Sequence, residues 1–291
     1  MAMPDMQGKV VVITGATSGI GAVAAEQLAA MGARIVLVAR DQTRAEAELA
    51  RLREKSTGPQ PSVHYADLSL LEDMQRVGRE IAASEPRIDV LINNAGALFS
   101  HRTLTRDGLE MTFATNHMSY FVLTEMLRQR LVASAPARVI NTSSDAHRRA
   151  RLDFDDLQSA NGYAGFKVYG RSKLANILYT RELARSLSGT GVTANSLHPG
   201  FVATRFGDQS GGAFSVMVRL AKSFAISPEK GAETIVYLAS SGEVGKASGE
   251  YFYKCRAVAP TKEAQDDEAA RRLWQESARL AGLAAQPHAS R

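Results

Sequence analysis

Cysteine is almost absent from this chain, and several classes of protein are excluded with it. Cys255 is the only cysteine among 291 residues, so the chain can form no internal disulfide and no cysteine-rich metal site. Long apolar runs are also missing: Val10–Ile13 and Ile35–Ala39 are as long as strands, far short of the roughly 20 residues that span a bilayer. Residues 1–9 lack the apolar core of a signal peptide. We therefore expect a cytoplasmic protein without a membrane anchor.

The chain also lacks a large excess of either positive or negative charge. The formal net charge is +5 and the pI is near 9.4, which favours anionic ligands only mildly. The basic residues are scattered, and the densest run, residues 147–151, is typical of a solvated loop, so we expect no nucleic-acid partner. Apolar residues make up 45% and charged residues 22%, as in a globular protein with a full core.

Short β-branched runs alternate with longer amphipathic stretches, the pattern of repeated βαβ units around a parallel sheet. The expected strands are Val10–Thr14, Arg34–Ala39, Val63–Ala66, Asp89–Asn93, Arg138–Thr142, Val192–Leu197 and Glu250–Tyr253. The expected helices are Ile20–Met31, Arg44–Lys55, Leu70–Ser84, Leu109–Leu131, Tyr169–Ser186, Pro228–Ala239 and Glu263–Leu280. Several strands are apolar throughout, as expected when helices cover both faces. The sequence predicts an α/β fold: one Rossmann-type doubly wound parallel sheet of about seven strands.

No linker or repeat divides the chain, so residues 1–291 are expected to form a single domain. Residues 8–200 would be its dinucleotide-binding part. The segment 201–227 breaks the alternation and mixes glycines with large apolar side chains. It reads either as an irregular part of the core or as a substrate lid, and we favour the lid because an α/β enzyme places such loops after the carboxyl end of a strand.

A glycine-rich loop follows the first expected strand. Its sequence is Gly15-Ala16-Thr17-Ser18-Gly19-Ile20-Gly21. Glycines let the chain turn sharply from strand to helix, and they let backbone N–H groups approach a pyrophosphate that lies at the positive end of the helix. A glycine triplet alone is weak evidence, but its place in the first βαβ unit predicts a dinucleotide site.

The end of the second expected strand bears on the choice of dinucleotide. An acidic residue there binds the ribose 2′-hydroxyl of NAD, whereas an arginine accommodates the 2′-phosphate of NADP. Here Arg40 occupies the tip, and the acidic group comes only at Asp41, which can equally cap the next helix. The alternative for Arg40 is a plain surface cation. We predict NADP(H) as cofactor.

Tyr169 and Lys173 are four residues apart, hence on one face of the expected helix. A nearby cation stabilises a phenolate, which makes the tyrosine a general acid/base for a carbonyl/alcohol pair. Tyr163 and Lys167 fit the same spacing, but glycines surround them and we interpret them as loop residues. On a common helix the two pairs would point about 240° apart, so they cannot serve one site. We assign the chemistry to Tyr169 and Lys173.

The chain resembles the short-chain dehydrogenase/reductase family over nearly its whole length. The matching motifs, in order, are Thr14-Gly15 with Gly19-Ile20-Gly21, Asn93-Asn94-Ala95-Gly96, Asn116, Asn141-Thr142-Ser143-Ser144, Tyr169 with Lys173, and His198-Pro199-Gly200. Within the family it is most similar to the retinol dehydrogenase-like reductases, on the runs Thr115-Asn116-His117, Ser143-Ser144-Asp145-Ala146-His147 and Ser172-Lys173-Leu174-Ala175-Asn176. This narrower likeness does not fix the substrate.

The resemblance implies catalytic roles. Tyr169 would exchange a proton with the substrate oxygen while hydride moves to or from the nicotinamide. Lys173 would lower the pKa of Tyr169 and bind the nicotinamide ribose. Ser144 would hold the substrate oxygen, whereas its neighbour Ser143 better fits a hydroxyl that satisfies the local backbone. Asn116 would bind a water that links Lys173 to solvent.

The resemblance also implies further contacts to the cofactor. Asp67, with Leu68, would lie by the adenine, and helix capping is the equal alternative for Asp67. The remaining contacts would come from Asn94, Ala95, Gly96, Pro199, Gly200, Val202 and Thr204, the threonine bonding the carboxamide. His117 and His147 have no partner at metal-ligand spacing and are left out of the mechanism. No metal is expected.

The sequence therefore predicts an oxidoreductase that transfers hydride between NADP(H) and a carbonyl or alcohol, with reduction of an apolar ketone or aldehyde favoured. One alternative is an epimerase or dehydratase of the same fold. Those relatives generally carry another glycine spacing and a larger C-terminal domain, for which Tyr251–Arg291 leaves no room. Another is a non-catalytic NADP(H)-binding sensor or scaffold, which has no need of a tuned phenol. The family usually assembles as homodimers or homotetramers through the helices carrying Asn116 and Tyr169, and a monomer is the alternative.

Overall fold

The computed structural model describes residues 5–200 and 226–284. The expected lid, residues 201–227, lies outside the described residues except for its last two. Val202 and Thr204 lie outside them as well.

A single sheet forms the centre of the molecule, with its strands in the order β3-β2-β1-β4-β5-β6-β7-β8. The strands are β1 (Val10–Thr14), β2 (Arg34–Ala39), β3 (Ser62–Tyr65), β4 (Val90–Asn93), β5 (Ala137–Thr142), β6 (Val192–Leu197), β7 (Tyr251–Tyr253) and β8 (Arg256–Ala257). All neighbours pair parallel except β7 and β8. The order reverses beside β1, where the chain passes from β3 at one edge back to β4. In doubly wound sheets, ligands bind at this switch point, beyond the carboxyl ends of the strands.

Side chains alternate between the two faces of the sheet, and both faces are buried. Val10 and Val12 of β1 belong to one apolar core, and Val11 and Ile13 belong to the other. Because successive residues of a strand point to opposite faces, a strand buried on both sides must be apolar at every position. Burial on both faces therefore explains the continuous apolar runs in the sequence.

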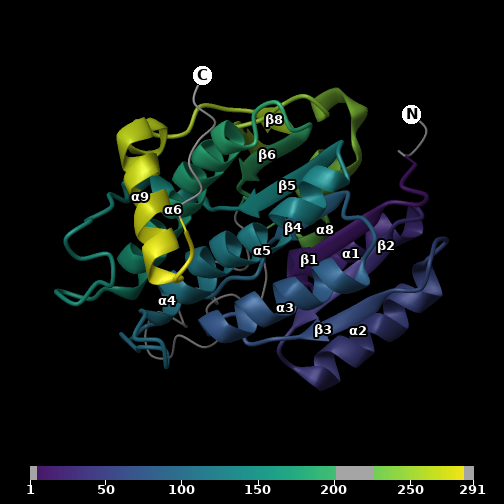
Figure 1. Ribbon diagram of the computed structural model, residues 1–291, viewed down its shortest axis with the longest axis horizontal. Coiled ribbons are helices and arrows are strands. Elements are labelled where there is room, and N and C mark those ends of the chain that lie inside the picture. The colour runs from purple at the N-terminus through teal and green to yellow at the C-terminus, as the bar shows by residue number, and fades with distance from the viewer. Residues whose placement is uncertain (1–4, 201–225, 285–291) are drawn as a thin grey trace.

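Helices cover both faces. The α-helices are α1 (Gly19–Ala30), α2 (Gln42–Lys55), α3 (Leu71–Ser84), α4 (Met111–Phe113), α5 (Ser119–Ala133), α6 (Gly165–Ser186), α8 (Pro228–Ser240) and α9 (Asp267–Leu280). Helices α1, α2 and α8 share one apolar core, and α3, α5, α6 and α9 share the other. Figure 1 shows α9 lying alongside α6, outside the sheet. The predicted doubly wound α/β fold is confirmed, with eight strands where about seven were expected.

Two local predictions were wrong. The expected helix Leu109–Leu131 is divided by a π-helical turn, η1 (Ala114–Met118), between α4 and α5. Helix α6 begins at Gly165, four residues earlier than predicted, so Lys167 is a helical residue and not part of a loop. The earlier start is possible because Gly165 packs against the backbone of Phe99, where a Cβ would lie 2.4 Å from a carbonyl oxygen.

Candidate active site

The predicted glycine loop turns tightly against the end of β4. A Cβ on Gly15 would lie 2.6 Å from Cα of Ala95, and one on Gly21 would lie 2.3 Å from the Gly15 carbonyl oxygen. Gly15 has φ +66°, a conformation that favours glycine. The amide of Asn94 donates to the Gly15 carbonyl over 3.0 Å. These contacts leave no space for a side chain at Gly15 or Gly21 and bring β1, α1 and β4 together.

Thr14 fixes the same junction from the other side. Its Oγ1 accepts hydrogen bonds from the backbone N–H groups of Asn94 and Ala95, each at 3.0 Å. Sequence reasoning included Thr14 in the family motif but gave it no role. The hydroxyl at the end of a strand beside a second strand was the available signal.

The amino end of α1 opens toward this junction. Ser18 is its N-cap, in an extended conformation, and makes no side-chain capping bond. A helix whose first N–H groups lack a side-chain cap has donors and a positive dipole end available for an anion. The loop from Gly15 to Gly21 therefore fits the phosphates of a dinucleotide.

Arg40 and Asp67 lie together at the carboxyl ends of β2 and β3. Nη1 of Arg40 is 3.7 Å from Oδ2 of Asp67, and 69% of the Arg40 side chain is exposed. Asp41 caps α2, since its Oδ1 accepts from the N–H of Arg44 over 2.9 Å. Asp67 does not cap α3, whose N-cap is Leu70; its carboxylate instead accepts from Ser69. The neighbouring Leu68 is buried in the core.

Tyr169, Ser144 and Lys173 meet at the carboxyl end of β5. Ser144 lies two residues after the end of β5 and caps the short helix η2 (Asp145–Arg149), its Oγ accepting from the N–H of Ala146 over 3.2 Å. Nζ of Lys173 donates to the Thr142 carbonyl oxygen over 3.0 Å and lies 5.6 Å from the centre of the Tyr169 ring. The expected combination of a phenol, an ammonium and a hydroxyl is therefore assembled in one place.

Burial sets the protonation of these groups. It raises the pKa of Tyr169 to about 12, and a hydrogen bond with Ser144 opposes that rise. Burial lowers the pKa of Lys173 to about 7. Desolvation disfavours the charged form of both groups. The lowering of the Tyr169 pKa by Lys173 stays a prediction.

The π-helical turn places Asn116 against Lys173. The Asn116 side chain bonds both backbone groups of Ala97, accepting over 2.8 Å and donating over 2.9 Å, and it donates to Ser172 Oγ over 3.0 Å. A Cβ on Gly96 would lie 3.3 Å from both Asn116 Oδ1 and Lys173 Nζ. A π-turn is a frequent feature of functional sites, and here it brings Asn116 near Lys173. The relay water predicted for Asn116 stays a prediction.

Other predicted residues lie near this edge of the sheet. Pro199 and Gly200 follow β6, and Gly200 has φ +87°. Ser143 Oγ donates to the Lys173 carbonyl oxygen over 2.7 Å. Its hydroxyl therefore satisfies a backbone group, as predicted, but one on α6 and not in the local backbone.

The second tyrosine–lysine pair is separate from the site. The hydroxyl of Tyr163 donates to the Phe99 carbonyl over 3.0 Å and lies 3.2 Å from Glu110. Burial raises the pKa of Tyr163 to about 12. Tyr163 thus holds its loop against the segment before α4.

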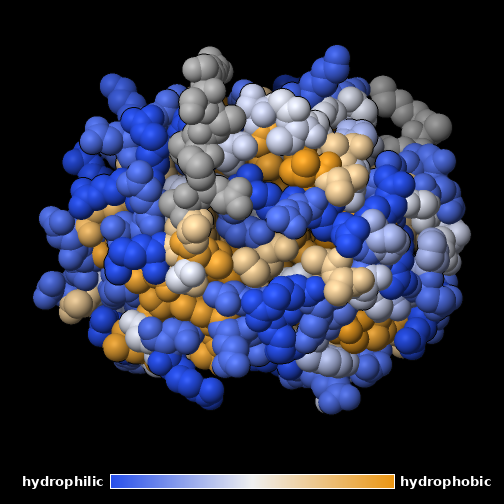
Figure 2. Space-filling model, viewed as in Figure 1, coloured by the Kyte–Doolittle hydropathy of each residue, from blue (hydrophilic) through white to orange (hydrophobic). Residues whose placement is uncertain are grey.

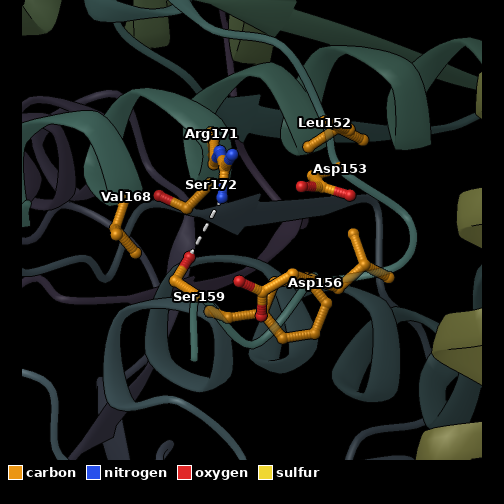
Figure 3. Close-up of a pocket in the computed structure, with 9 residues that line it drawn as sticks. Leu152, Asp153, Asp156, Ser159, Val168, Arg171 and Ser172 are labelled. Atoms are coloured by element: carbon orange, nitrogen blue, oxygen red, sulfur yellow. Dashed lines mark hydrogen bonds between the residues drawn. The ribbon is translucent and has the colours of Figure 1, made fainter. Parts of the chain in front are cut away.

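A small cavity lies on the other side of α6 from β5. Figure 3 shows Arg171 and Ser172 facing Ser159 across it, with the bond from Arg171 Nη1 to Ser159 Oγ at 3.3 Å. Its volume of about 10 Å³ admits at most one water, so it cannot hold a substrate.

A buried chain of amides and hydroxyls also links β4, β5 and α6, and sequence reasoning missed it. Asn93 Nδ2 donates to Asn141 Oδ1 over 2.9 Å, Asn141 Nδ2 donates to Thr180 Oγ1 over 2.9 Å, and Thr180 donates to the Asn176 carbonyl over 2.6 Å. This chain ties β4, β5 and α6 together. Polar residues at the ends of apolar strands were the only sequence signal for it.

Comparison with known proteins gives the family. The family model described as short chain dehydrogenase matches residues 9–212, and the chain belongs to this family. Human retinol dehydrogenase 13 is 42% identical over 96% of this chain and 86% of its own. Human retinol dehydrogenase 14 is 41% identical over 96% and 88%, and the human WW domain-containing oxidoreductase 39% over 95% and 69%. The predicted likeness to the retinol dehydrogenases is confirmed.

Solved structures agree. The crystal structure of an uncharacterized protein from Mycobacterium paratuberculosis has a TM-score of 0.78 and 32% identity, covering 97% of this chain and 96% of its own. The RhlG/NADP active-site complex of Pseudomonas aeruginosa has a TM-score of 0.69 and 27% identity, covering 87% of this chain and 97% of its own. The protein is an oxidoreductase of the NAD(P)-dependent kind.

Within residues 5–200 and 226–284, none of the helices is long and apolar enough to cross a membrane. Nor do histidine, cysteine, aspartate and glutamate side chains of these ranges gather into a group of three that could hold a metal.

Proposed function

We propose that this protein reduces an apolar ketone or aldehyde with NADPH, working in the cytoplasm. The observation that carries the proposal is the meeting of Tyr169, Ser144 and Lys173 beside the glycine loop. A non-catalytic scaffold has no need of a buried phenol paired with a hydroxyl and an ammonium, so the arrangement favours catalysis.

The protonation state of Tyr169 supports the direction of reduction. With its pKa raised to about 12 by burial, the phenol carries its proton at neutral pH. A protonated phenol can donate to the oxygen of a carbonyl as that oxygen gains negative charge. Ser144 donates a hydrogen bond to the same oxygen. Lys173, when protonated, stabilises the negative charge that develops there. The bound dinucleotide supplies the hydride.

An apolar side chain beside the phenol supports the substrate class. Phe166 lies one turn before Tyr169 on α6, and the two ring centres are 6.4 Å apart. It is 53% exposed, one of the most exposed large apolar residues that the structure describes. An exposed aromatic next to a reacting group suits an apolar substrate.

The test of catalysis compares the two tyrosines. NADPH oxidation is followed with a panel of ketones, aldehydes and quinones, for wild type, Tyr169→Phe and the matched control Tyr163→Phe. We expect Tyr169→Phe to lose about 10²-fold or more in kcat, the usual value of general acid catalysis, and Tyr163→Phe to stay near wild type. Absence of turnover with every carbonyl would favour the scaffold, and an active Tyr169→Phe would contradict the site.

The preference for NADP(H) is supported by Arg40. Its guanidinium is largely exposed at the tip of β2, while Asp41 is engaged as a helix cap and so is poorly placed to bind a ribose. We expect a higher kcat/KM with NADPH than with NADH. Arg40→Ala should lower kcat/KM about tenfold for NADPH and change it little for NADH, because one charge-assisted bond to a phosphate is lost. A wild-type preference for NADH would contradict this proposal.

A further inference from the structure

A second tyrosine ring lies against Lys173, and it comes from α5. Tyr120 is the second residue of that helix and is 1% exposed. Nζ of Lys173 lies over the Tyr120 ring at 5.6 Å from its centre, the same distance that separates it from the centre of the Tyr169 ring. The amine therefore has two phenol rings near it, and the sequence predicted a role for only one of them.

Hydrogen bonds satisfy this amine only in part. A charged lysine has three N–H donors. Across residues 5–200 and 226–284 its one acceptor is the Thr142 carbonyl oxygen, at 3.0 Å. That oxygen also accepts from Asn176 Nδ2 over 3.3 Å and from the Tyr120 hydroxyl over 3.4 Å. Because a carbonyl oxygen has two lone pairs and three donors share this one, Thr142 alone cannot compensate a buried ammonium.

No opposite charge in the described part of the chain balances the ammonium either. Burial lowers the pKa of Lys173 to about 7, and no carboxylate opposes that fall. The titratable groups that face Nζ are the phenols of Tyr120 and Tyr169, and burial raises the pKa of both, so both are uncharged at pH 7. The neighbours from η1 and from the end of β4, Asn116 and Gly96, are uncharged as well. Stabilisation of the charged form must therefore come from neutral groups.

The face of an aromatic ring is such a group. It carries partial negative charge, and a cation within about 6 Å of the ring centre is attracted to it, most strongly where water is excluded. Lys173 meets both conditions, because its amine is 5.6 Å from the centre of the Tyr120 ring and the residue is only 3% exposed. The attraction acts on the ammonium and hardly on the neutral amine. Since the pKa of Lys173 is about 7, a modest attraction changes the charged fraction at neutral pH several-fold.

We propose that Tyr120 is a positioning residue whose ring face, and not its hydroxyl, holds the Lys173 side chain in its charged form at the site. The hydroxyl contributes little, because at 3.4 Å it competes with Lys173 for the Thr142 oxygen. The contact between ring and cation does not depend on the reaction. Its consequence for catalysis, that a charged lysine stabilises the negative charge on the substrate oxygen, rests on the proposed function.

Fluorination of the ring tests the contact without any substrate or cofactor. Fluorine withdraws electrons from an aromatic face while the ring keeps nearly the same size and shape. Tyr120→Phe is compared with proteins that carry phenylalanines of increasing fluorine content at position 120. Nuclear magnetic resonance measures the pKa of Lys173 from its ¹³Cε signal, which is the one missing from Lys173→Met. We expect Tyr120→Phe to keep the wild-type pKa of Lys173 and the most fluorinated ring to lower it by about 1.

Phe121 is the matched control, because it is the next residue of the same helix and equally buried, but packs against α9. Its ring lies edge-on to Trp274 at 5.2 Å. The same fluorinated rings at position 121 should leave the pKa of Lys173 unchanged. A pKa that stays constant across the series at position 120, or that falls as far in the series at position 121, overturns the proposal. So does an equally large fall in Tyr120→Phe, since the hydroxyl would then be the active group.

Kinetics test the consequence for the reaction. Lysine is charged below its pKa, so kcat for carbonyl reduction should fall as the pH rises through that pKa. Tyr120→Leu removes the ring, and the fall should then begin about one pH unit lower. Relative to wild type, kcat should be about fivefold lower at pH 7 and less than about twofold lower at pH 5.5. Tyr120→Phe should follow the wild-type profile.

A ring that only fills space would give a different profile. Its loss would lower kcat by the same factor at pH 5.5 and at pH 7, and that result overturns the role of Tyr120 in the reaction. If Tyr120→Leu does not fold, the most fluorinated ring at position 120 takes its place in the kinetic test. If the wild type reduces no carbonyl, the proposed function fails, and the titration of Lys173 alone decides whether the Tyr120 ring holds its charge.

Discussion

The amine of Lys173 is buried, and burial disfavours its charged form. Its side chain is only 3% exposed, and burial lowers its pKa from 10.5 to about 7. Between pH 7 and 10.5 the unfolded chain therefore binds a proton at this position that the folded protein does not. By linkage, the free energy of unfolding rises with pH over that window, by up to about 1.4 kcal/mol per pH unit from this one group. Below pH 7 both states carry the proton, and the full cost of burying the charge remains.

Substitution of this lysine should reveal that cost. We expect Lys173→Met to be more stable relative to wild type at pH 7 than at pH 9.5, because the advantage shrinks as the wild type is relieved of its buried charge. Urea unfolding at a series of pH values measures the difference. Lys246→Met, at an exposed lysine, is the control and should show no such trend. A pH-independent difference for Lys173→Met would mean that the ammonium is solvated in the folded protein.

Helix α1 depends on Gly21 in spite of the helix propensities. Replacing a helical glycine by alanine ordinarily stabilises a helix by up to about 1 kcal/mol. Here the new Cβ would lie 2.3 Å from the Gly15 carbonyl oxygen and 2.5 Å from Asn94 Nδ2. Backbone cannot yield as a flexible side chain can, so overpacking, at roughly 1–3 kcal/mol, outweighs the gain in propensity.

We therefore expect Gly21→Ala to lower both the melting temperature and the affinity for NADPH, because the loop must open to admit the methyl group. Thermal unfolding and a fluorescence titration with NADPH measure the two effects. Gly242→Ala is the control, since a Cβ there meets nothing within 4 Å. Unchanged NADPH binding in Gly21→Ala would show that the phosphates do not use this loop.

Elements with a strong local pattern were predictable from the sequence, and elements made by tertiary contacts were not. Strands β1, β2 and β6 have the predicted bounds because apolar runs buried on both faces have sharp ends. Strand β8 was missed because it has only two residues, too few to show an alternation of apolar and polar side chains. The π-helical turn was missed because contacts of Asn116 with Ala97 and Ser172, distant in sequence, accompany it.

The candidate site likewise has residues that the sequence predicted and contacts that it did not. Tyr169, Lys173 and the glycine loop could be predicted because their chemistry depends on spacing within one element. The contact of His117 Nε2 with Ser277 Oγ could not, because it joins two elements that only the fold brings together. The protonation of Tyr169 could not be predicted either, since it depends on burial.

Helix α9 packs on α5 and α6. The family resemblance implies that dimers or tetramers form through these two helices. Trp274 of α9 stacks on Tyr179 of α6 at 5.7 Å between ring centres and meets Phe121 of α5 edge-on at 5.2 Å. Asp267 bonds Arg185 over 2.7 Å. On the face of the molecule drawn in Figure 2, hydrophilic residues predominate and apolar ones form separate patches. The apolar sides of α5 and α6 are thus already paired within one chain.

We therefore expect a monomer of 31.4 kDa in solution at micromolar concentration, measured by light scattering after size exclusion. Stable interfaces between subunits need a large apolar patch, and here the chain's own last helix occupies it. Trp274→Asp should loosen α9, because it places a carboxylate against Phe121 and Tyr179, and should raise the apparent mass through the surface it exposes. A wild-type mass of two or four times the chain would show that assembly uses another surface, and the outer side of α9 would then be the first place to look for it.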